Sequence, residues 1–302
     1  MVISRYHRHA TICDPCNWIK TGFSASEPPT SQVRPPRSLV AQYPSISLFF
    51  PAWNEEDYVE RAVSRALEVL PALTDDFEII VVNDASTDRT REVCEALAQK
   101  VPQLRVIHHP VNLKLGGAMR TGLAASTKDI VVYSDVDLPW DMRELERALH
   151  LMSYLEADMI CAFRFDRTSE GAKRIIYSFV YNMLIRSLFD IQIKDVNFSF
   201  KVMHRRVLEA MELHSQGSFI DAELVVKAIR QGFRVFQMGV DYFPRTRGVS
   251  TLASPSVITK MVRELVKLYP KMRAPQPPVH PVRLPPSVQQ LHAVPPGRTA
   301  RG

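Results

Sequence analysis

The stretch Val131-Val132-Tyr133-Ser134-Asp135-Val136-Asp137 joins an apolar run to two carboxylates separated by a single residue. An apolar run of this length predicts a buried strand, and the charged pair must lie where that strand leaves the core. In extended backbone the side chains at i and i+2 point to the same side, so Asp135 and Asp137 can face one ion. Mg²⁺ and Mn²⁺ prefer such oxygen ligands, together with substrate phosphates. The stretch therefore predicts a divalent-metal site, although a D-x-D also occurs in ordinary loops.

Three further pairs of strand and helix are predicted before this run. Strands are expected at 46–50, 77–82 and 104–108, and helices at 58–70, from Ser86 or Thr87 to Lys100, and up to Ala125. The alternation predicts an α/β fold, with a doubly wound, mostly parallel sheet flanked by helices. After the D-x-D, a helix is predicted at 142–155 and a strand near 158–163.

Polar residues follow three of these predicted strands. Asn54 and Glu55 come after the first, Asp84 after the second, and Asp135 and Asp137 after the fourth. Ligands bind at the carboxyl ends of the strands in doubly wound sheets, so these side chains predict one site. No G-x-G-x-x-G follows the first strand and no G-x-x-x-x-G-K-[ST] occurs, which excludes a dinucleotide cradle and a P-loop of the usual kind.

The net positive charge of the chain comes from its two ends, outside the predicted domain. Residues 1–42 and 274–302 each carry a net charge of +3 out of a total of +6, so residues 43–273 are neutral overall. A nucleic-acid partner is therefore not expected. We predict a disordered leader at 1–42, a single domain at 43–273 and a Pro-rich disordered tail at 274–302. The leader contains a cluster of His and Cys residues whose spacing is not a standard zinc-binding pattern.

The cysteine content and the hydropathy of the chain indicate the cellular compartment of the protein. Four cysteines in 302 residues do not make a disulfide framework, and Cys94 and Cys161 are expected to be buried thiols. No apolar run is long enough to span a bilayer, and the first residues lack the apolar core of a secretory signal. We expect a cytoplasmic protein whose only membrane contact is peripheral, on the cytoplasmic face.

Three segments carry a family resemblance, and in chain order they are Pro51-Ala52-Trp53-Asn54-Glu55-Glu56, Val82-Asn83-Asp84-Ala85-Ser86-Thr87-Asp88 and Ser134-Asp135-Val136-Asp137. Together they resemble the motifs of family 2 glycosyltransferases with the GT-A fold, closest to the polyprenyl-phosphate, dolichol-phosphate mannosyltransferase-like branch. The resemblance implies that Pro51, Asn54, Glu55 and Asp84 belong to the nucleotide-sugar site. It also implies that Asp135 and Asp137 hold Mg²⁺ or Mn²⁺ across the donor diphosphate. The chain departs from the family at Trp53, Asn83 and Ala85.

Downstream segments extend the resemblance to the acceptor side. Asp195 matches an acid that acts as a base or orients the acceptor, and Asp221 matches a second acidic motif that is also suited to a helix N-terminus. Arg245 and Arg247 match a phosphate-binding segment. The helix predicted at 173–193 is apolar around much of its circumference, so it is either a core helix or an interfacial helix beside a lipid, and another basic helix is predicted at 255–271.

The function expected from these observations is glycosyl transfer. An inverting enzyme would move a hexose from a GDP- or UDP-sugar to a polyprenyl phosphate with the help of a divalent cation, and Asp195, Asp221 and Asp137 would be the catalytic acids. The alternatives are a family 2 enzyme acting on a hydroxyl acceptor, a nucleotidyltransferase and a non-catalytic binding protein.

Overall fold

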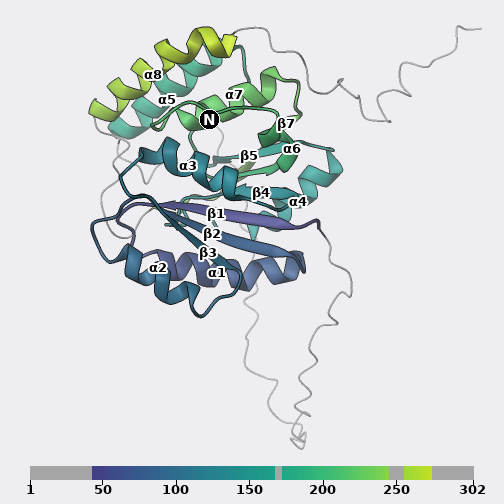
Figure 1. Cartoon of the computed structure of the whole chain (residues 1–302). Helices are drawn as coiled ribbons and strands as arrows, with labels where there is room; N and C mark the ends of the chain where they lie inside the picture. The colour runs from purple at the N-terminus through teal and green to yellow at the C-terminus, as the bar shows by residue number, and fades with distance from the viewer. Residues whose placement is uncertain (1–42, 167–171, 245–254, 274–302) are drawn as a thin grey trace, which may run out of the picture. The chain divides into compact units, whose positions relative to one another are not determined.

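Seven strands form one sheet in the described part of the chain, which comprises residues 43–166, 172–244 and 255–273 of a computed structural model (Figure 1). The strands are β1 Ile46–Ala52, β2 Phe77–Asn83, β3 Leu104–His108, β4 Ile130–Tyr133, β5 Met159–Arg164, β6 Lys201–His204 and β7 Val235–Val240. Their order is β3-β2-β1-β4-β6-β5-β7. The predicted tails at 1–42 and 274–302 lie outside the described residues, as do Arg245 and Arg247.

The sheet is mostly parallel, as predicted. β1 pairs in parallel with β2 and β4, β2 with β3, and β5 with β7, whereas β6 runs antiparallel between β4 and β5. The strands β6 and β7 were not predicted, because the four residues of β6 are too few to show a strand pattern by themselves. The insertion of β6 places its first residue, Lys201, opposite Tyr133 at the end of β4 and opposite Cys161 within β5.

Helices pack on both faces of the sheet (Figure 1). They are α1 Val59–Leu73, α2 Thr90–Ala98, α3 Lys114–Ala125, α4 Glu144–Tyr154, α5 Ala172–Phe189, α6 Arg205–Glu209, α7 Ile220–Arg230 and α8 Pro255–Arg273. The prediction for the start of α2 was wrong, because Asp88 accepts from the backbone N–H and hydroxyl of Thr90 and delays the helix. Helix α5 ends four residues before its predicted end, next to Asp190 with φ 53°.

Two apolar layers cover the sheet, one on each face. Leu48 and Phe50 of β1 belong to the layer that includes α1 and α4, whereas Phe49 belongs to the layer that includes α3 and α7. This division follows from the period of two along a strand. Because both faces of the sheet are buried, we expect the polar functional groups at the ends of the strands.

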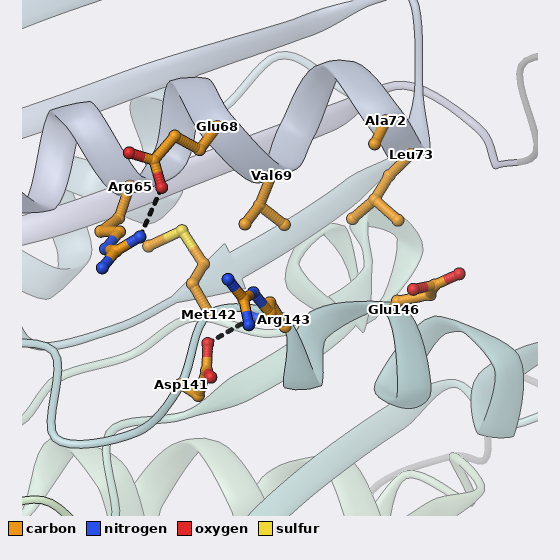
Figure 2. A pocket seen from close by; sticks show the side chains of 9 residues that line it. All are labelled: Arg65, Glu68, Val69, Ala72, Leu73, Asp141, Met142, Arg143 and Glu146. Carbon is orange, nitrogen blue, oxygen red and sulfur yellow. Dashed lines mark hydrogen bonds and ion pairs between the residues drawn. The ribbon is translucent and has the colours of Figure 1, made fainter. Parts of the chain in front are cut away.

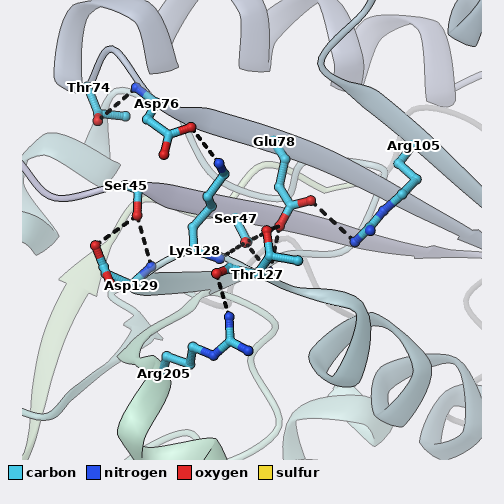
Figure 3. Close-up of polar contacts among 10 residues, drawn as sticks. All are labelled: Ser45, Ser47, Thr74, Asp76, Glu78, Arg105, Thr127, Lys128, Asp129 and Arg205. Atoms are coloured by element: carbon cyan, nitrogen blue, oxygen red, sulfur yellow. Dashed lines mark hydrogen bonds and ion pairs between the residues drawn. The ribbon is translucent and has the colours of Figure 1, made fainter.

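Polar side chains at the amino ends of the strands satisfy one another (Figure 3). Glu78 accepts hydrogen bonds from Ser47 at 2.6 Å and from Thr127, and it pairs with Arg105 at 3.2 Å. Lys128 pairs with Asp76 at 2.5 Å in the same cluster. This network joins the segments that precede β1, β2 and β4, and it lies away from the predicted site residues, which follow the carboxyl ends of the same strands.

Candidate active site

The loops after β1 and β2 are tied together by hydrogen bonds around Asn54. Its backbone N–H donates to Ser86 Oγ at 3.0 Å, and its Oδ1 accepts from the N–H of Thr87 at 2.8 Å. The N–H of Glu55 donates to Thr90 Oγ1 at 2.8 Å. Asn54 has φ 56°, a left-handed backbone that asparagine tolerates better than most residues. Asn54 therefore holds the two loops in register at the carboxyl edge.

Pro51 lies where β1 extends beyond its neighbour β4. Pairing with β4 ends at Phe49 and Tyr133, whereas pairing with β2 continues through Pro51 and Val82. A proline without an N–H is tolerated here, because β1 needs no donor toward β4 beyond that point. Pro51 thus marks the position at which the sheet opens toward the site.

Asp84 is buried, and a histidine that the sequence reasoning missed bonds to it. Asp84 Oδ1 lies 2.7 Å from His109 Nδ1 and accepts from the N–H of Leu113 at 2.7 Å. On the other side of the ring, His109 Nε2 lies 2.9 Å from Thr121 Oγ1. His109 directly follows β3, so its place after a predicted strand is the signal that could have identified it. The next residue after Asp84, Ala85, adopts φ 54°, which explains why glycine suits this position.

Asp135 and Asp137 are half-buried and follow directly on β4. The hydroxyl of Tyr133 donates to Asp135 Oδ1 at 3.3 Å. The Ser134 hydroxyl, which accepts from Trp140 Nε1 at 3.0 Å, fixes the turn by donating to the carbonyl of Asp135 at 2.9 Å. The two carboxylates are hard oxygen donors of the kind that Mg²⁺ and Mn²⁺ take.

No group of three or more His, Cys, Asp or Glu side chains is arranged around a potential metal site among the described residues. Mg²⁺ is usually held by one or two carboxylates together with substrate phosphates and water, and Asp135 and Asp137 fit that set of donors.

Asp221 forms a buried ion pair with Lys201, the first residue of β6. Lys201 Nζ lies 2.5 Å from Asp221 Oδ1, and the side chains are 1% and 3% exposed. Burial is the largest cause that raises the pKa of Asp221 to about 6; Lys201 opposes the rise, and the charges of Asp135 and Asp195 add to it. Asp221 lies in the first turn of α7, but it does not cap the helix, whose N-cap is Phe219 without a side-chain bond.

Asp195 is buried in a two-pronged ion pair with Arg164. Arg164 Nε donates to Asp195 Oδ2 at 2.8 Å and Nη2 to Oδ1 at 3.2 Å. The guanidinium also lies over the rings of Phe198 and Tyr242, at 5.4 and 5.3 Å. Arg164 is the last residue of β5. It was not predicted as a site residue, because the sequence does not show that β5 lies beside the segment before β6.

The structure brings together Asp135, Asp195 and Asp221, since the charges of the first two both act on the third. Asp137 belongs to the same group, because Asp135, Asp221 and Asp137 all raise the pKa of the buried Tyr133 phenol. The loop with Asn54 and Glu55 and the buried Asp84 form the neighbouring part of the same edge, after β1 and β2.

Two cavities among the described residues differ in how they relate to these elements. One is bordered by α1 and the start of α4 and contains none of the predicted site residues (Figure 2). The other is lined by Phe163, Arg164, Phe165, Lys194 and Asp195. The second cavity continues the carboxyl edge past β5 and contains more cations than acids, along with two aromatic rings.

The cysteines and the helix lengths test two further expectations from the sequence. Cys94 and Cys161 are free and buried, as predicted, and burial raises the pKa of both thiols to about 12. Within the described ranges, the length and apolar character that a membrane-spanning helix requires are not combined in any helix.

Comparison with known proteins places this site in a family. Residues 47–211 match the glycosyl transferase family 2, and the chain belongs to that family. It is thus a glycosyltransferase, and the nucleotidyltransferase and non-catalytic alternatives are not retained.

The chain is 33% identical over 219 residues to the glycosyltransferase AglD of Haloferax volcanii, covering 70% of this chain and 35% of AglD. It is 26% identical to dolichyl-phosphate beta-glucosyltransferase ALG5A of Trichomonas vaginalis, over 65% of each protein. It is 25% identical to dodecaprenyl-phosphate galacturonate synthase of Rhizobium johnstonii, over 68% of this chain and 61% of that protein. These relatives confirm the resemblance to the polyprenyl-phosphate branch, although the chain spans less than two thirds of their length.

Solved structures confirm the GT-A fold. The mannosyltransferase PcManGT from Pyrobaculum calidifontis, in complex with GDP-Man and Mn²⁺, has a TM-score of 0.56 at 18% identity, covering 78% of this chain and 70% of that one. Glucosyl-3-phosphoglycerate synthase from Mycobacterium tuberculosis with UDP has a TM-score of 0.56 at 19% identity, covering 75% and 80%.

Proposed function

We propose that this glycosyltransferase moves a hexose from a GDP- or UDP-sugar to a polyprenyl phosphate, with inversion at the anomeric carbon and with a divalent cation. Relatives whose names contain dolichyl-phosphate and dodecaprenyl-phosphate support the acceptor. Neighbours solved with UDP, or with GDP-Man and Mn²⁺, have the same fold.

The carboxyl ends of β1, β2 and β4 would hold the donor. Asp84 and the loop with Asn54 and Glu55 would bind the nucleoside, while Asp135 and Asp137 would hold Mg²⁺ or Mn²⁺. When bound, that cation would neutralise charge on the departing nucleoside diphosphate. The residues themselves supply orientation, because Asp84 is fixed by His109 and Leu113, and Asp135 by Tyr133.

The cavity beside Asp195 is the observation that supports a lipid phosphate acceptor best. Arg164 and Lys194 outnumber the acid Asp195 there, which suits an anionic head group, and Phe163 and Phe165 suit an apolar chain. Lys194 Nζ lies 4.4 Å from the centroid of the Phe163 ring, so this cation is held at the cavity wall. Arg245 and Arg247, outside the described residues, are proposed to contact the same phosphates.

The state of Asp195 agrees with a phosphate acceptor. Both of its oxygens accept hydrogen bonds from the Arg164 guanidinium, so the carboxylate is already engaged with a cation. A phosphate monoester has a second pKa near 6 and is largely dianionic at about pH 7, so it needs no strong base. Asp195 would orient the acceptor through Arg164, whereas a hydroxyl acceptor would require Asp195 or Asp221 as a general base.

A peripheral membrane contact would follow from the outer face of α5. Five of its side chains are 45–59% exposed and share one helical face, namely Ile176, Tyr177, Phe179, Val180 and Met183. Helix α8 lies next to α5 (Figure 1), with the rings of Phe189 and Tyr269 5.5 Å apart. Val262 and Val266 of α8 are also exposed. We propose that this apolar surface rests on the bilayer that contains the acceptor lipid.

The proposal is tested by transfer of labelled sugar from GDP-mannose, UDP-glucose or UDP-N-acetylglucosamine into a lipid-extractable product, with polyprenyl phosphate and Mg²⁺ or Mn²⁺. We expect metal-dependent lipid labelling by the wild type, none by Asp137→Ala, and wild-type labelling by Asp75→Ala, an exposed acid before β2. Transfer to a saccharide or protein hydroxyl, with no labelled lipid, would instead support the hydroxyl alternative.

A further inference from the structure

A lysine is buried beside the strand that leads into the D-x-D turn. In the sheet Lys201 is the register partner of Tyr133 on β4 and of Cys161 on β5, so it lies in the middle of the sheet rather than at a border strand. Its side chain is 1% exposed. Isolated buried ammonium groups are costly, and a lysine persists at such a place only with close partners.

Lys201 has three such partners, and one of them reaches the D-x-D. Its Nζ donates to Asp221 Oδ1 at 2.5 Å and to the carbonyl of Phe198 at 2.6 Å. It also lies 5.5 Å from the centroid of the Tyr133 ring, within the range of a cation–π contact. The Tyr133 hydroxyl in turn donates to Asp135 Oδ1 at 3.3 Å. A continuous set of contacts therefore runs from α7 through β6 and β4 to the first acid of the D-x-D.

Stability alone does not account for this arrangement. A buried ion pair contributes little more to folding than apolar residues of the same volume, because desolvation offsets the attraction between the charges. Groups behind a ligand shell, in contrast, orient the ligands, and removing them typically weakens metal binding or activity about 10–100-fold.

We propose that Lys201 is a positioning residue for glycosyl transfer. It fixes Asp221 and the Tyr133 ring, and through the Tyr133 hydroxyl it sets the orientation of the Asp135 carboxylate that faces the donor. This inference rests on the proposed role of Asp135 and Asp137 in holding the cation of a nucleoside diphosphate.

Helix α7, which contains Asp221, also contains a second buried ion pair that serves as a matched control. Lys227 Nζ lies 2.6 Å from Glu223 Oε1, also donates to the carbonyl of Glu212, and the side chains of this pair are 6% and 0% exposed. The two ion pairs thus have the same chemistry and similar burial. Glu223 also accepts from the backbone N–H groups of His214 and Ser215, so this pair holds a loop, and within the described part of the chain it forms no hydrogen bond with Tyr133 or Asp135.

The test measures Mn²⁺-dependent binding of UDP and GDP by calorimetry, together with thermal unfolding, for Lys201→Met, Lys227→Met and Tyr133→Phe. We expect both lysine variants to lose stability. Of the two lysine variants, only Lys201→Met should weaken nucleotide binding with Mn²⁺, by about tenfold or more. Tyr133→Phe should reproduce part of that loss. Equal nucleotide affinity in Lys201→Met and Lys227→Met would overturn the positioning role.

A double variant keeps the test decisive if Lys201→Met does not fold. Lys201→Met/Asp221→Asn removes both charges of the pair and should regain stability, because no unpaired ion is left behind. Its Mn²⁺-dependent nucleotide affinity should remain low, whereas wild-type affinity would show that the pair is only structural. If the wild type binds neither nucleotide with Mn²⁺, the proposed metal-dependent function itself fails, which is a different outcome from unchanged binding in the variants.

Discussion

Arg164 donates from two nitrogens to the two oxygens of Asp195, at 2.8 and 3.2 Å, although 31 residues separate them in the sequence. The pair joins the end of β5 to the segment before β6, at the wall of the cavity that we assign to the acceptor. Its planar, two-pronged geometry depends on a guanidinium and cannot be made by an ammonium group.

Arg164→Lys should therefore raise KM for the acceptor several-fold while leaving KM for the donor near its wild-type value. Lysine keeps the charge but can hold only one of the Asp195 oxygens at a time. Steady-state kinetics with each substrate varied in turn would measure the split. Arg206→Lys is the matched control, because Arg206 also donates from two nitrogens to an acid, Asp158, outside the acceptor cavity. A larger change in donor KM than in acceptor KM would contradict this assignment.

His109→Ala should weaken nucleotide binding. The histidine lies 2.7 Å from Asp84 Oδ1 and is itself held by Thr121, so its loss leaves Asp84 with fewer restraints. A hydrogen bond to a charged group is worth about 1.5–3 kcal/mol, so we expect a loss of about tenfold or more in UDP or GDP affinity by calorimetry. His108→Ala removes the adjacent histidine, which bonds to Asn83 at 3.0 Å, and should have a smaller effect. Equal losses in the two variants would argue against a specific role for His109.

Activity should rise with pH through about 6, because burial raises the pKa of Asp221 to about 6 and its ion pair with Lys201 needs the ionised acid. We expect kcat/KM of Asp221→Asn to be low and to lack this acidic limb. A pH profile of the two proteins would test this, and an unchanged limb in the variant would assign it to another group.

The stability of the protein should show the opposite pH dependence from the same residue. A raised pKa means that the folded state holds this proton more tightly than the unfolded chain. The contribution of Asp221 to the free energy of unfolding is then full below its ordinary pKa of 3.8 and is lost as the pH rises through about 6. Denaturant unfolding of the wild type and Asp221→Asn at about pH 5 and about pH 8 should show the difference between them shift in that direction. A difference that is constant with pH would contradict the raised pKa.

Gly116→Ala should destabilise the protein. A Cβ at this position in α3 would overlap the carbonyl oxygen of Ser215 and the backbone of Gln216, and backbone atoms cannot turn aside. Overpacking of this kind costs about 1–3 kcal/mol, which denaturant unfolding would measure. Gly217→Ala is the control, because the nearest atom to its Cβ would be a Glu264 carboxylate oxygen at 3.3 Å, at the end of a side chain that can move.

Ile176→Ser/Phe179→Ser/Met183→Ser should reduce binding to vesicles that contain anionic lipid. These α5 side chains are 58%, 59% and 48% exposed, and burying them in a bilayer is the proposed source of membrane affinity. Vesicle sedimentation would measure the loss. Tyr154→Ser, at a residue of α4 that is 85% exposed, should bind as the wild type does. Unchanged vesicle binding by the triple variant would remove this surface from the proposal.

The central strands and their carboxyl-end acids were predictable from the sequence. Apolar runs such as Val131–Tyr133 are buried in the sheet, and the local sequence alone shows where each run ends. Asp84, Asp135 and Asp137 follow such runs, so they could be assigned to the carboxyl ends of neighbouring strands. The motif order around these residues also predicted the glycosyltransferase family, which the comparisons confirm.

Only the tertiary structure decided which groups face those acids. Arg164 meets Asp195, and Lys201 meets both Asp221 and Tyr133, because β6 inserts antiparallel between β4 and β5. His109 reaches Asp84 because β3 lies next to β2 in the sheet. The physical reason is that the hydrophobic pattern of a strand determines which of its residues are buried. The choice of neighbouring strands depends on packing over the whole sheet, and the polar partners follow from that choice.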